Sequence, residues 1–534
     1  MGEDTQRHYL YGASVQGIQG FIFQTNKLQE IVGASELVER ICTSLFAKVL
    51  GEKGRHEELV EKLQGDKNAI VNAAGNIKYE FCTWDACEKV VKRFPKVVME
   101  FAPGVTISQA VVDMAGKSFE DAVQELEAKL RVQRNRPFRD TAIGLMGIER
   151  SRQTGLPVIY KEYKVKEEGK DGKVIEVKSG HMDEGTFQKL YYEDKGRNII
   201  RKRSTQTLCQ KAFGTRYIQA KVAFMIEEMT QKNDWIAIIH ADGNGMGQVI
   251  QKIGTRKDVF REFSIALDNA TTEAAVQAFN DVVPDFETPI PMRPVVLSGD
   301  DHTVICRADL AIPYVEAFIK HFEENTSDLL GETIKENRIF KGLPNDRLTA
   351  CAGVAFVKSS YPFYYGYQLA EALCDRAKKD TKSLYGADEG RLPASCIMFH
   401  KVQDSFVTSF DDIVKRELTP WKGYSFEFGP YYINVKRTDR WTVEKLIDAS
   451  RKLEGESMSS VKSGLRNWLS LMHINPEMAK QRLERLKYIS GKKEYINEVT
   501  TSRDTVKEVY SVFDILAVNS VNTQQIKKRK EANK

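Results

Sequence analysis

The sequence predicts an α+β fold in which a βαββαβ unit occurs twice. In the second half of the chain, an apolar strand at 235–239 is followed by helical sequence at 259–279. Two further apolar runs, 295–297 and 303–306, are separated by a bend at 298–301. Short β-rich runs that meet at a Gly/Asp bend are typical of a β-hairpin. This region therefore contains a strand, a helix and a hairpin in that order.

A helix and a strand complete this unit. Four apolar residues have the i, i+3, i+4, i+7 spacing of an amphipathic helix: Val315, Phe318, Ile319 and Phe322. A strand at 348–357, a helix at 369–377 and a short strand at 397–399 follow. The order of strand and helix, hairpin, then helix and strand is that of a ferredoxin-like palm domain, a sheet with helices on one face.

The same order recurs more faintly near the N-terminus. Its elements are a strand at 9–14, a helix at 28–49, a hairpin at 69–81 bent at Gly75-Asn76, a helix at 84–94 and a strand at 105–112. We therefore expect two copies of one palm domain in the chain.

Two further regions complete the predicted architecture. Between the copies, β-rich runs at 164–166 and 174–177 flank Asp171-Gly172, which predicts a β-hairpin linker. After about residue 410 the pattern turns helical, with one apolar stripe formed by Val461, Leu465, Trp468, Leu469 and Met472 and a further helix opened by Pro476. The predicted domains are a first palm at 1–150, a linker at 151–230, a second palm at 231–410 and a helical domain at 411–534.

The composition excludes several classes of protein. The chain has 534 residues, of which 42% are hydrophobic, which excludes a disordered or collagen-like protein. No stretch approaches the roughly 20 apolar residues of a membrane helix, and the N-terminus lacks the pattern of a secretion signal. We therefore expect a cytoplasmic protein without membrane contact. The eight cysteines form no CxxC pair, which favours buried free thiols over a zinc ribbon or a disulfide framework.

The formal charge of the chain is +5, and the basic excess is concentrated at 161–203 and 527–530. Solvated surface is the simplest interpretation of both segments. Contact with a nucleic acid or an acidic partner is the alternative, because phosphate groups attract clustered Lys and Arg.

Three aspartates mark the candidate site of the second palm. Asp242 follows the first strand, and Asp300 and Asp301 lie at the bend of the hairpin, which is adjacent to that strand in a palm. At about 4 Å and an effective dielectric constant near 20, two like charges repel by roughly 4 kcal/mol. Such a cluster needs protons, a basic partner or a cation, and Asp oxygens suit Mg²⁺ or Mn²⁺. Two such ions can activate a 3′-hydroxyl and stabilise a pyrophosphate leaving group.

Small residues and a lysine surround these acids. Gly243, Gly245 and Gly299 leave room for a triphosphate to approach the backbone. Lys378, on a later helix, could reach a γ-phosphate, although a solvated helix end explains it equally well. The first palm has no carboxylate at its bend, so we expect it to bind no ion and to serve either as a nucleotide site or as structural support.

These residues resemble the large polymerase-like subunit of type III CRISPR effector complexes, a family related to GGDEF cyclases. The first palm contributes GIQGFIF and VGASELVE, and the second contributes HADGNGMG, SGDD, TACAGVAF and AEALCDRAKK. The resemblance spans about residues 8 to 400. It implies that ATP is condensed into a signalling nucleotide, typically cyclic oligoadenylate, when the complex binds target RNA. The partners it implies are the other subunits of such a complex, its guide RNA and the target RNA.

The resemblance also implies roles for individual residues. Asp242, Asp300 and Asp301 are expected to be catalytic and to bind two Mg²⁺ or Mn²⁺ ions. The nucleotide is expected beside a set of small or polar residues and one lysine: Gly243, Asn244, Gly245, Ser298, Gly299 and Lys378.

The sequence departs from the family pattern in four ways. Ser298 replaces the first glycine of Gly-Gly-Asp-Asp, and Asn244 replaces an aspartate, which leaves room for another acceptor of the adenylate such as S-adenosylmethionine. The cysteine knuckle between the palms is absent, and no histidine precedes an aspartate, so we expect no HD nuclease domain and no cleavage of single-stranded DNA. A non-catalytic scaffold and a stand-alone defence polymerase remain the alternatives.

Overall fold

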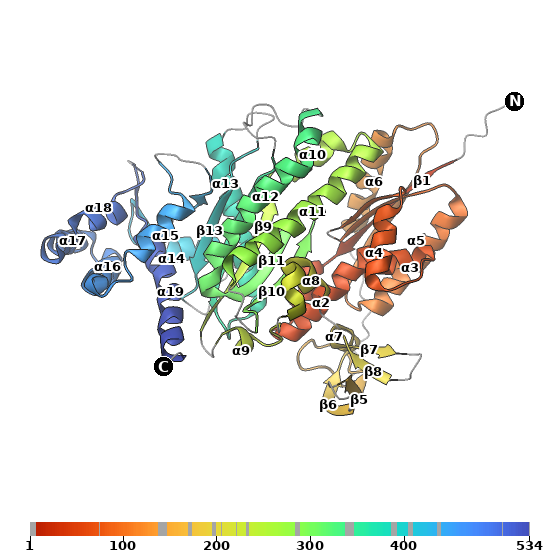
Figure 1. Cartoon of the computed structure of the whole chain (residues 1–534), viewed down its shortest axis with the longest axis horizontal. Helices are drawn as coiled ribbons and strands as arrows, with labels where there is room; N and C mark the ends of the chain where they lie inside the picture. Colours follow the sequence, from red (N-terminus) through yellow and green to blue (C-terminus); the bar gives the residue numbers. More distant parts are fainter. Residues whose placement is uncertain are drawn as a thin grey trace.

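The structure is a computed structural model of the chain. It describes residues 7–73, 75–136, 147–168, 174–194, 199–203, 206–219, 222–230, 234–283, 289–336, 347–385, 392–403, 409–434, 439–504 and 506–532. Within these residues the predicted α+β fold with two palm domains is confirmed (Figure 1).

The first palm is built on a four-stranded antiparallel sheet with the strand order β2-β3-β1-β4. Its strands are β1 (Tyr9–Gln16), β2 (Ala69–Ala73), β3 (Asn76–Phe81) and β4 (Thr106–Asp113). The predicted bend at Gly75-Asn76 lies where β2 gives way to β3, and Gly75 has a φ of 76°. A left-handed backbone of this kind favours glycine. Ala74, the residue before it, lies outside the described residues.

Helices cover both faces of this first sheet. They are α1 (Ile18–Ile22), α2 (Leu28–Arg40), a π-helical turn (Ile41–Leu45), α3 (Phe46–Leu50), α4 (His56–Gly65), α5 (Trp84–Phe101) and α6 (Phe119–Arg134). On one face, the rings of Tyr11 and Phe46 stack, and Phe94 packs against Phe46. On the other face, Leu126 of α6 lies directly over Gly12. The sequence did not predict α4 or α6.

The second palm contains a larger sheet with the strand order β10-β11-β9-β12-β13-β15. Its strands are β9 (Trp235–Gly243), β10 (Met292–Ser298), β11 (Asp301–Arg307), β12 (Ala350–Lys358), β13 (Cys396–Lys401) and β15 (Tyr431–Tyr432). The first four strands along the sheet repeat the order of the first palm, because β9 lies between its hairpin and β12 as β1 lies between its own hairpin and β4. β13 pairs with β12 in parallel and extends the sheet beyond the palm core.

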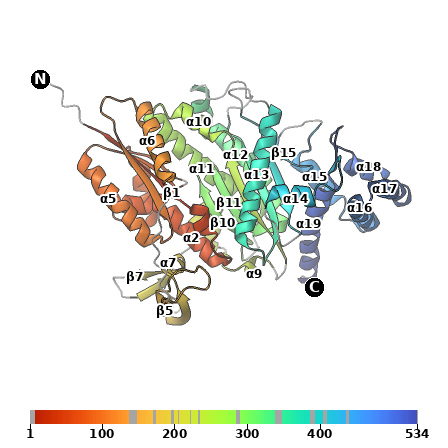
Figure 2. The ribbon, with the colours of Figure 1, turned by 180° about the vertical axis from the view of Figure 1, so that it is seen from behind.

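Helices also cover both faces of the second sheet, as opposite views show (Figures 1 and 2). They are α10 (Met246–Ile253), α11 (Lys257–Val282), α12 (Ala308–Glu336) and α13 (Phe363–Tyr385). α12 lies on the face of His302, whose ring is 4.5 Å from that of Phe318. α13 lies on the opposite face, so close to β12 that a Cβ on Gly353 would be 1.9 Å from the carbonyl oxygen of Ala370. The β12–α13–β13 crossover therefore covers a face that the palm order alone leaves open.

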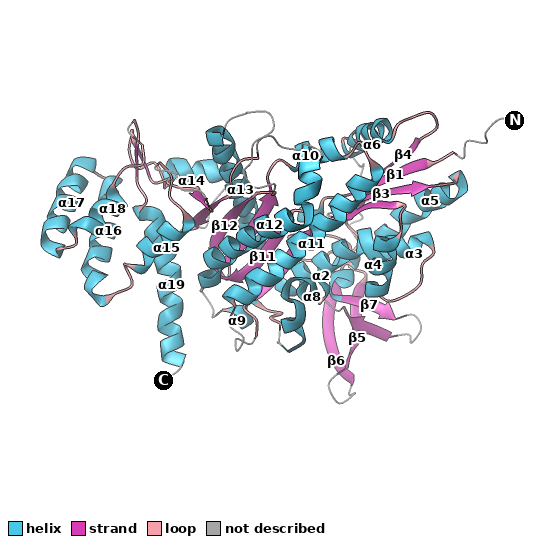
Figure 3. Ribbon diagram, turned by 45° about the horizontal axis from the view of Figure 1, so that its top comes forward, coloured by secondary structure: helices cyan, strands magenta, loops and turns pink. Residues whose placement is uncertain are grey.

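The region between the palms forms a four-stranded sheet with the order β6-β5-β8-β7 (Figure 3). It contains β5 (Tyr160–Glu168), β6 (Val174–Met182), α7 (Glu184–Leu190), β7 (Tyr191–Asp194) and β8 (Ile199–Lys202). β5 and β6 are the two predicted strands of the linker hairpin, and the predicted bend at Asp171-Gly172 lies outside the described residues. Lys189 of α7 donates to the carbonyl oxygen of Phe21 at 2.9 Å, which ties this sheet to the first palm.

Two short helices follow the linker sheet and belong spatially to the second palm. They are α8 (Thr207–Phe213) and α9 (Ile226–Met229). Phe213 of α8 stacks on Phe279 of α11, with their ring centroids 4.3 Å apart. The palms also contact each other directly, since α2 lies against β10 and α11 lies against β2.

The C-terminal region is mainly helical, as predicted. Its elements are α14 (Phe410–Arg416), β14 (Tyr424–Ser425), β15, α15 (Val443–Arg451), α16 (Ser459–Met472), α17 (Pro476–Ser490), α18 (Lys493–Thr500), β16 (Glu508–Val509) and α19 (Val512–Ala532). Because β15 pairs with β13, this region also completes the sheet of the second palm. All eight cysteines are free and seven are buried, with Cys82 exposed. In the described part of the chain, no helix is long and apolar enough to span a membrane.

Candidate functional site between the palms

The three predicted aspartates meet at one edge of the second sheet. β11 pairs with β9 in a register that places Thr303 opposite His240 and His302 opposite Ala241. The same register brings the start of β11, at Asp301, beside Asp242. The bend between β10 and β11 places Asp300 within hydrogen-bonding distance of the Asp242 carboxyl group. The structure therefore gathers the three carboxyl groups, as the sequence predicted.

This proximity changes the acidity of two carboxyl groups. Burial raises the pKa of Asp300 to about 7, and the charge and hydrogen bond of Asp242 add to the effect. Burial also raises the pKa of Asp301 to about 7, with further contributions from Asp242 and Glu371. A carboxyl group in a poorly solvated place beside another acid retains its proton, because the charged form is disfavoured. Without a cation, the cluster therefore holds protons near neutral pH.

Lys378 is the basic partner of the cluster. Its ammonium group on α13 donates to the Asp242 carboxylate and, at 3.0 Å, to the carbonyl oxygen of Gly243. The pKa of Lys378 lies above its usual value, because the attraction of Asp242 outweighs the opposing effect of burial. The predicted lysine is thus part of the acidic site, where it neutralises one of its carboxylates.

The predicted glycines are required by close contacts and backbone geometry. A Cβ on Gly243 would lie 2.8 Å from Asp300 Oδ2 and 2.9 Å from Met246 Cγ. Gly245 and Gly299 have φ values of 68° and 63°, which favour glycine. The Gly299 amide donates to Asp268 Oδ1 at 3.1 Å, which fixes the hairpin bend to α11. These glycines hold the acids in place, and their predicted contact with a nucleotide stays a prediction.

Asn244 and Ser298 occupy different environments. Asn244 is buried, its amide side chain donates to Thr349 Oγ1 at 3.1 Å, and its backbone amide donates to the Thr349 carbonyl oxygen at 2.8 Å. Asn244 thus links the turn after β9 to the residue that precedes β12. Ser298, in contrast, lines the hollows described next.

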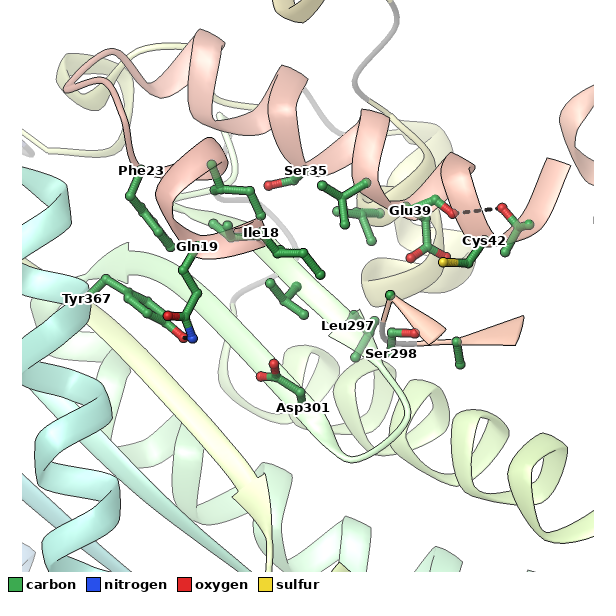
Figure 4. Close-up of a pocket in the computed structure, with 18 of the residues that line it drawn as sticks. Ile18, Gln19, Phe23, Ser35, Glu39, Cys42, Leu297, Ser298, Asp301 and Tyr367 are labelled. Atoms are coloured by element: carbon green, nitrogen blue, oxygen red, sulfur yellow. Dashed lines mark hydrogen bonds between the residues drawn. The ribbon is translucent and has the colours of Figure 1, made fainter. Parts of the chain in front are cut away.

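A cavity of about 140 Å³ lies between the two palms, beside the acidic edge (Figure 4). The second palm contributes Ser298, Asp301 and Tyr367 to its wall, and the first palm contributes α1 and α2 with residues such as Gln19 and Glu39. A second hollow of about 370 Å³ shares four lining residues with it: Glu39, Thr43, Asn72 and Ser298. Its volume is within the range of about 300–1,000 Å³ that is typical of ligand sites.

Comparison with known proteins gives this site a family context. Residues 235–384, which contain all three aspartates and Lys378, match the family model of the second palm domain of Cas10/Cmr2. This segment is similar to the second palm domain of Cas10/Cmr2. The predicted resemblance to the large subunit of type III CRISPR complexes is thereby confirmed. None of the curated proteins matches the chain.

The fold of almost the whole chain is similar to that of solved Csm1–Csm4 structures. The complex with cA3 matches with a TM-score of 0.55 at 15% identity, covering 98% of this chain and 70% of that chain. The complex with pppApA gives a TM-score of 0.54 at 14% identity, covering 97% and 69%. The Csm1–Csm4 subcomplex in the type III-A CRISPR-Csm interference complex gives 0.54 at 14%, covering 98% and 71%. At these identities the likeness concerns the fold.

The first palm contributes side chains to the candidate site that the sequence analysis did not assign. Gln19 donates to the hydroxyl oxygen of Tyr367 at 2.9 Å and to Glu371 Oε1 at 3.0 Å. Phe23 stacks on the Tyr367 ring at 4.5 Å (Figure 4). The His240 ring meets the Tyr367 ring edge-on at 5.5 Å. Gln19 and Phe23 lie within GIQGFIF and Glu371 within AEALCDRAKK, so the motifs contained them, but their contacts depend on how the two palms pack.

A second set of residues that the sequence analysis did not assign contacts the end of β10, next to the acidic hairpin bend. Lys211 of α8 donates to both carboxylate oxygens of Asp268, at 3.0 and 3.1 Å, and to the carbonyl oxygen of Leu297 at 2.9 Å. Glu39 lies 3.9 Å from the same ammonium group, and burial raises its pKa. No pattern in the sequence marks Lys211, because it lies in the region between the palms.

The carboxylate oxygens of the acidic cluster are of the chemical type that binds divalent cations. Asp301 Oδ1 is buried and has no hydrogen-bond partner, with His240 Nδ1 at 3.4 Å. Buried carboxylate oxygens are hard ligands of the type that Mg²⁺ and Mn²⁺ prefer. Among the described residues, however, no three His, Cys, Asp or Glu side chains are arranged to hold a metal ion. Asp242 is engaged by Lys378, so a cation bound here would have to compete with this ammonium group.

Proposed function

We propose that this protein is the nucleotidyltransferase subunit of a type III CRISPR effector complex and condenses ATP into a signalling nucleotide, most simply cyclic oligoadenylate. One observation carries the proposal: the only carboxylates at the bends of the two palm hairpins among the described residues, those of Asp300 and Asp301, converge with Asp242 beside a cavity between the palms. The similar Csm1–Csm4 structures contain pppApA, cA3, cA4 and ATP, which supports nucleotide chemistry on this fold.

The aspartates and the lysine of the site would have different roles. Asp242, Asp300 and Asp301 would hold the divalent cations, which supply charge neutralisation for the phosphates and activation of the attacking hydroxyl group. Asp300 and Asp301 have pKa values of about 7, so both can lose their protons near neutral pH when a positive charge approaches. Lys378 would then release the Asp242 carboxylate and become available to a phosphate group.

The first palm would form the opposite wall of the nucleotide site. Gln19 and Phe23 hold the Tyr367 ring at the cavity wall, and Glu39 lies between the two hollows. The hairpin of the first palm contributes no carboxylate, so the catalytic charge comes from one palm and part of the binding surface from the other. This arrangement would exclude water from one side of the reacting groups.

ATP is the acceptor that we propose. The alternative, an acceptor such as S-adenosylmethionine, depended on Asn244 facing the nucleotide. The Asn244 side chain is buried against Thr349 and lines neither hollow, so its difference from the family pattern gives no reason for another acceptor.

The proposed partners are the other subunits of a type III complex, its guide RNA and the target RNA. The similar chains were solved as Csm1 bound to Csm4, and one of them belongs to the type III-A interference complex. We therefore propose a Csm4-like subunit as a direct partner and the cytoplasm as the place of action.

The test is to incubate labelled ATP and Mn²⁺ or Mg²⁺ with the protein, alone and in its complex with and without target RNA, and to analyse the products by mass spectrometry. We expect pyrophosphate and adenylate oligomers, and we expect the double substitution Asp300→Ala and Asp301→Ala to abolish them. The matched control is Asp411→Ala with Asp412→Ala, an adjacent pair in the first turn of α14. Unchanged synthesis by the first double variant would refute the site, and RNA co-purification without any turnover would favour a scaffold.

A further inference from the structure

A third hollow, a pocket of about 640 Å³, lies at the opposite end of β9 from the acidic cluster. It opens where α16 and α19 of the C-terminal region meet the ends of β12 and β13. Trp235, the first residue of β9, lies in its wall, and Asp242 lies seven residues further along the strand. At about 3.3 Å per residue, the two places are roughly 23 Å apart. The pocket is therefore separate from the proposed ATP site.

Cationic side chains from three elements converge on this pocket. The ammonium groups of Lys358 and Lys401 lie 4.1 and 4.3 Å from the centroid of the Trp235 ring, which is a favourable cation–π geometry. Arg466 of α16 lines the same pocket, and Lys401 also donates to Ser520 Oγ of α19 at 2.5 Å. The lysines are thus fixed in place by an aromatic ring and by a hydroxyl group.

The charged side chains among the described residues that line this pocket are all basic. None of the described residues that line it is an aspartate or a glutamate. Burial lowers the pKa of Lys401 to about 8, and the neighbouring charges of Lys358 and Arg466 lower it further in the same direction. Like charges held this close together repel one another, so an anion placed between them would be attracted by all three.

We propose that this pocket binds a phosphate-bearing ligand of nucleotide size. Its volume is within the range of about 300–1,000 Å³ that is typical of ligand sites. Lysine and arginine side chains are the groups with which proteins usually bind phosphates. The phosphate can come from a free nucleotide or from a short stretch of an RNA strand, and both sources present the same chemistry to the three cations. This site goes beyond the proposed function and does not depend on it.

The experiment measures binding of two probes to the full-length chain in the presence of EDTA, so that metal-dependent binding of nucleotides elsewhere does not contribute. The probes are inorganic triphosphate and a fluorescent single-stranded oligouridylate of ten nucleotides. The test variant combines Lys401→Gln with Arg466→Gln. The control is Lys445→Gln, because Lys445 also lies over a tryptophan ring, 4.4 Å from the centroid of Trp441, but does not line the pocket.

We expect the test variant to bind at least one of the probes about tenfold more weakly or worse, since it loses two charged groups that hydrogen-bond to the phosphates. For the RNA probe, the slope of log affinity against log salt should fall by about 1.4, which is about 0.7 for each lost phosphate contact. The control should bind as the unmodified protein does.

Which probe responds identifies the source of the phosphate. A loss confined to triphosphate indicates a free nucleotide, and a loss confined to oligouridylate indicates an RNA strand. Arg466→Gln alone, a change at an exposed side chain, separates binding from folding if the double variant is destabilised. Equal dissociation constants for the test and control variants with both probes, or no binding of either probe at millimolar concentration, would overturn the proposal.

Discussion

The two palm hairpins share a strand order but differ in their chemistry. In the first palm, the bend of the β2–β3 hairpin approaches β1 with neutral groups, and Ser14 Oγ donates to Asn76 Oδ1 at 3.0 Å. In the second palm, the β10–β11 hairpin brings Asp300 and Asp301 to the end of β9. One hairpin is therefore stabilised by an ordinary hydrogen bond, whereas the other gathers acids that disfavour one another's charge.

This difference shows which features of a palm determine its role. Strand order and register place the hairpin bend beside the central strand in both copies. Only the residues at the bend decide whether that place can attract cations. In the first palm, α1 and α2 form one wall of the cavity instead. The two palms therefore contribute different parts of a single site.

The two palms should differ most in how their stability and activity respond when a glycine is replaced by alanine, and Gly243 of the second palm should be the sensitive position. Its Cβ would lie 2.8 Å from Asp300 Oδ2, so Gly243→Ala must displace the acidic hairpin. We expect a loss of about 1–3 kcal/mol in the free energy of unfolding, typical of overpacking, and a fall in turnover of more than about tenfold. The measurements are urea denaturation and the rate of pyrophosphate release.

Gly20 in α1 of the first palm is the matched control for this substitution. A Cβ on Gly20 has no atom within 4 Å, so Gly20→Ala should leave both measurements nearly unchanged or stabilise α1 slightly. Equal effects of the two substitutions would show that the acidic hairpin is no more tightly constrained than the first palm.

The palm folds were predictable because their strands and helices are local patterns of apolar residues. β9, β10 and β11 are short Val/Ile-rich runs with a Gly-Asp bend between the last two, and the helix of Val315 and Phe318 has a clear 3.6-residue period. The strands β7 and β8, with four residues each, are too short to produce such a pattern. β15 has two residues and joins the palm sheet only through pairing with β13, which no local sequence can indicate.

The site was predictable in its acids but less so in their surroundings. Asp242 lies at the end of β9 and Asp301 at the start of β11, two strands that the palm order places side by side, so the convergence of the acids follows from topology. Lys378 could be named, but whether it contacts a phosphate or a carboxylate depends on the distance between α13 and β9. Gln19 and Lys211 could not be assigned, because their partners lie 348 and 57 residues away in the chain.

A smaller effect should show whether the first palm takes part in nucleotide binding. Gln19 is a positioning residue, because it bonds to Tyr367 and Glu371 of the second palm across the cavity. We expect Gln19→Ala to raise the KM for ATP by about tenfold, the equivalent of roughly 1.4 kcal/mol for one hydrogen bond to a charged group, and to change kcat much less.

Gln124→Ala is a suitable control for Gln19→Ala. Gln124 bonds within its own helix, to Glu120 at 3.3 Å, and lines neither hollow. Its replacement should leave both KM and kcat unchanged. A fall in kcat at constant KM for Gln19→Ala would instead mean that the first palm acts on the reacting groups and not on the bound nucleotide.

A further difference between the hairpins concerns the pH dependence of stability without metal. The pKa values of Asp300 and Asp301 are about 7 in the folded chain, against an ordinary value of 3.8. Between about pH 4 and pH 7 the folded state therefore holds protons that the unfolded state has released, so the free energy of unfolding falls as the pH rises through this window and levels off above it. Replacing both residues by Asn, which stays neutral, should remove this part of the decline.

Thermal unfolding in EDTA at pH 5 and pH 8 measures the decline for the two proteins. Burial also raises the pKa of Asp514 to about 7, so the Asn variant should retain a smaller decline, and the difference between the two curves belongs to the hairpin. Mn²⁺ added at pH 8 should raise the Tm of the unmodified protein alone, because a bound cation favours the charged carboxylates. Asn76→Ala at the bend of the first palm's hairpin should keep the full decline, since it leaves Asp300 and Asp301 in place. Parallel curves for the unmodified protein and the Asn variant would mean that the acids of the second palm are as well solvated as those on an ordinary surface, and the chemical contrast between the two hairpins would then disappear.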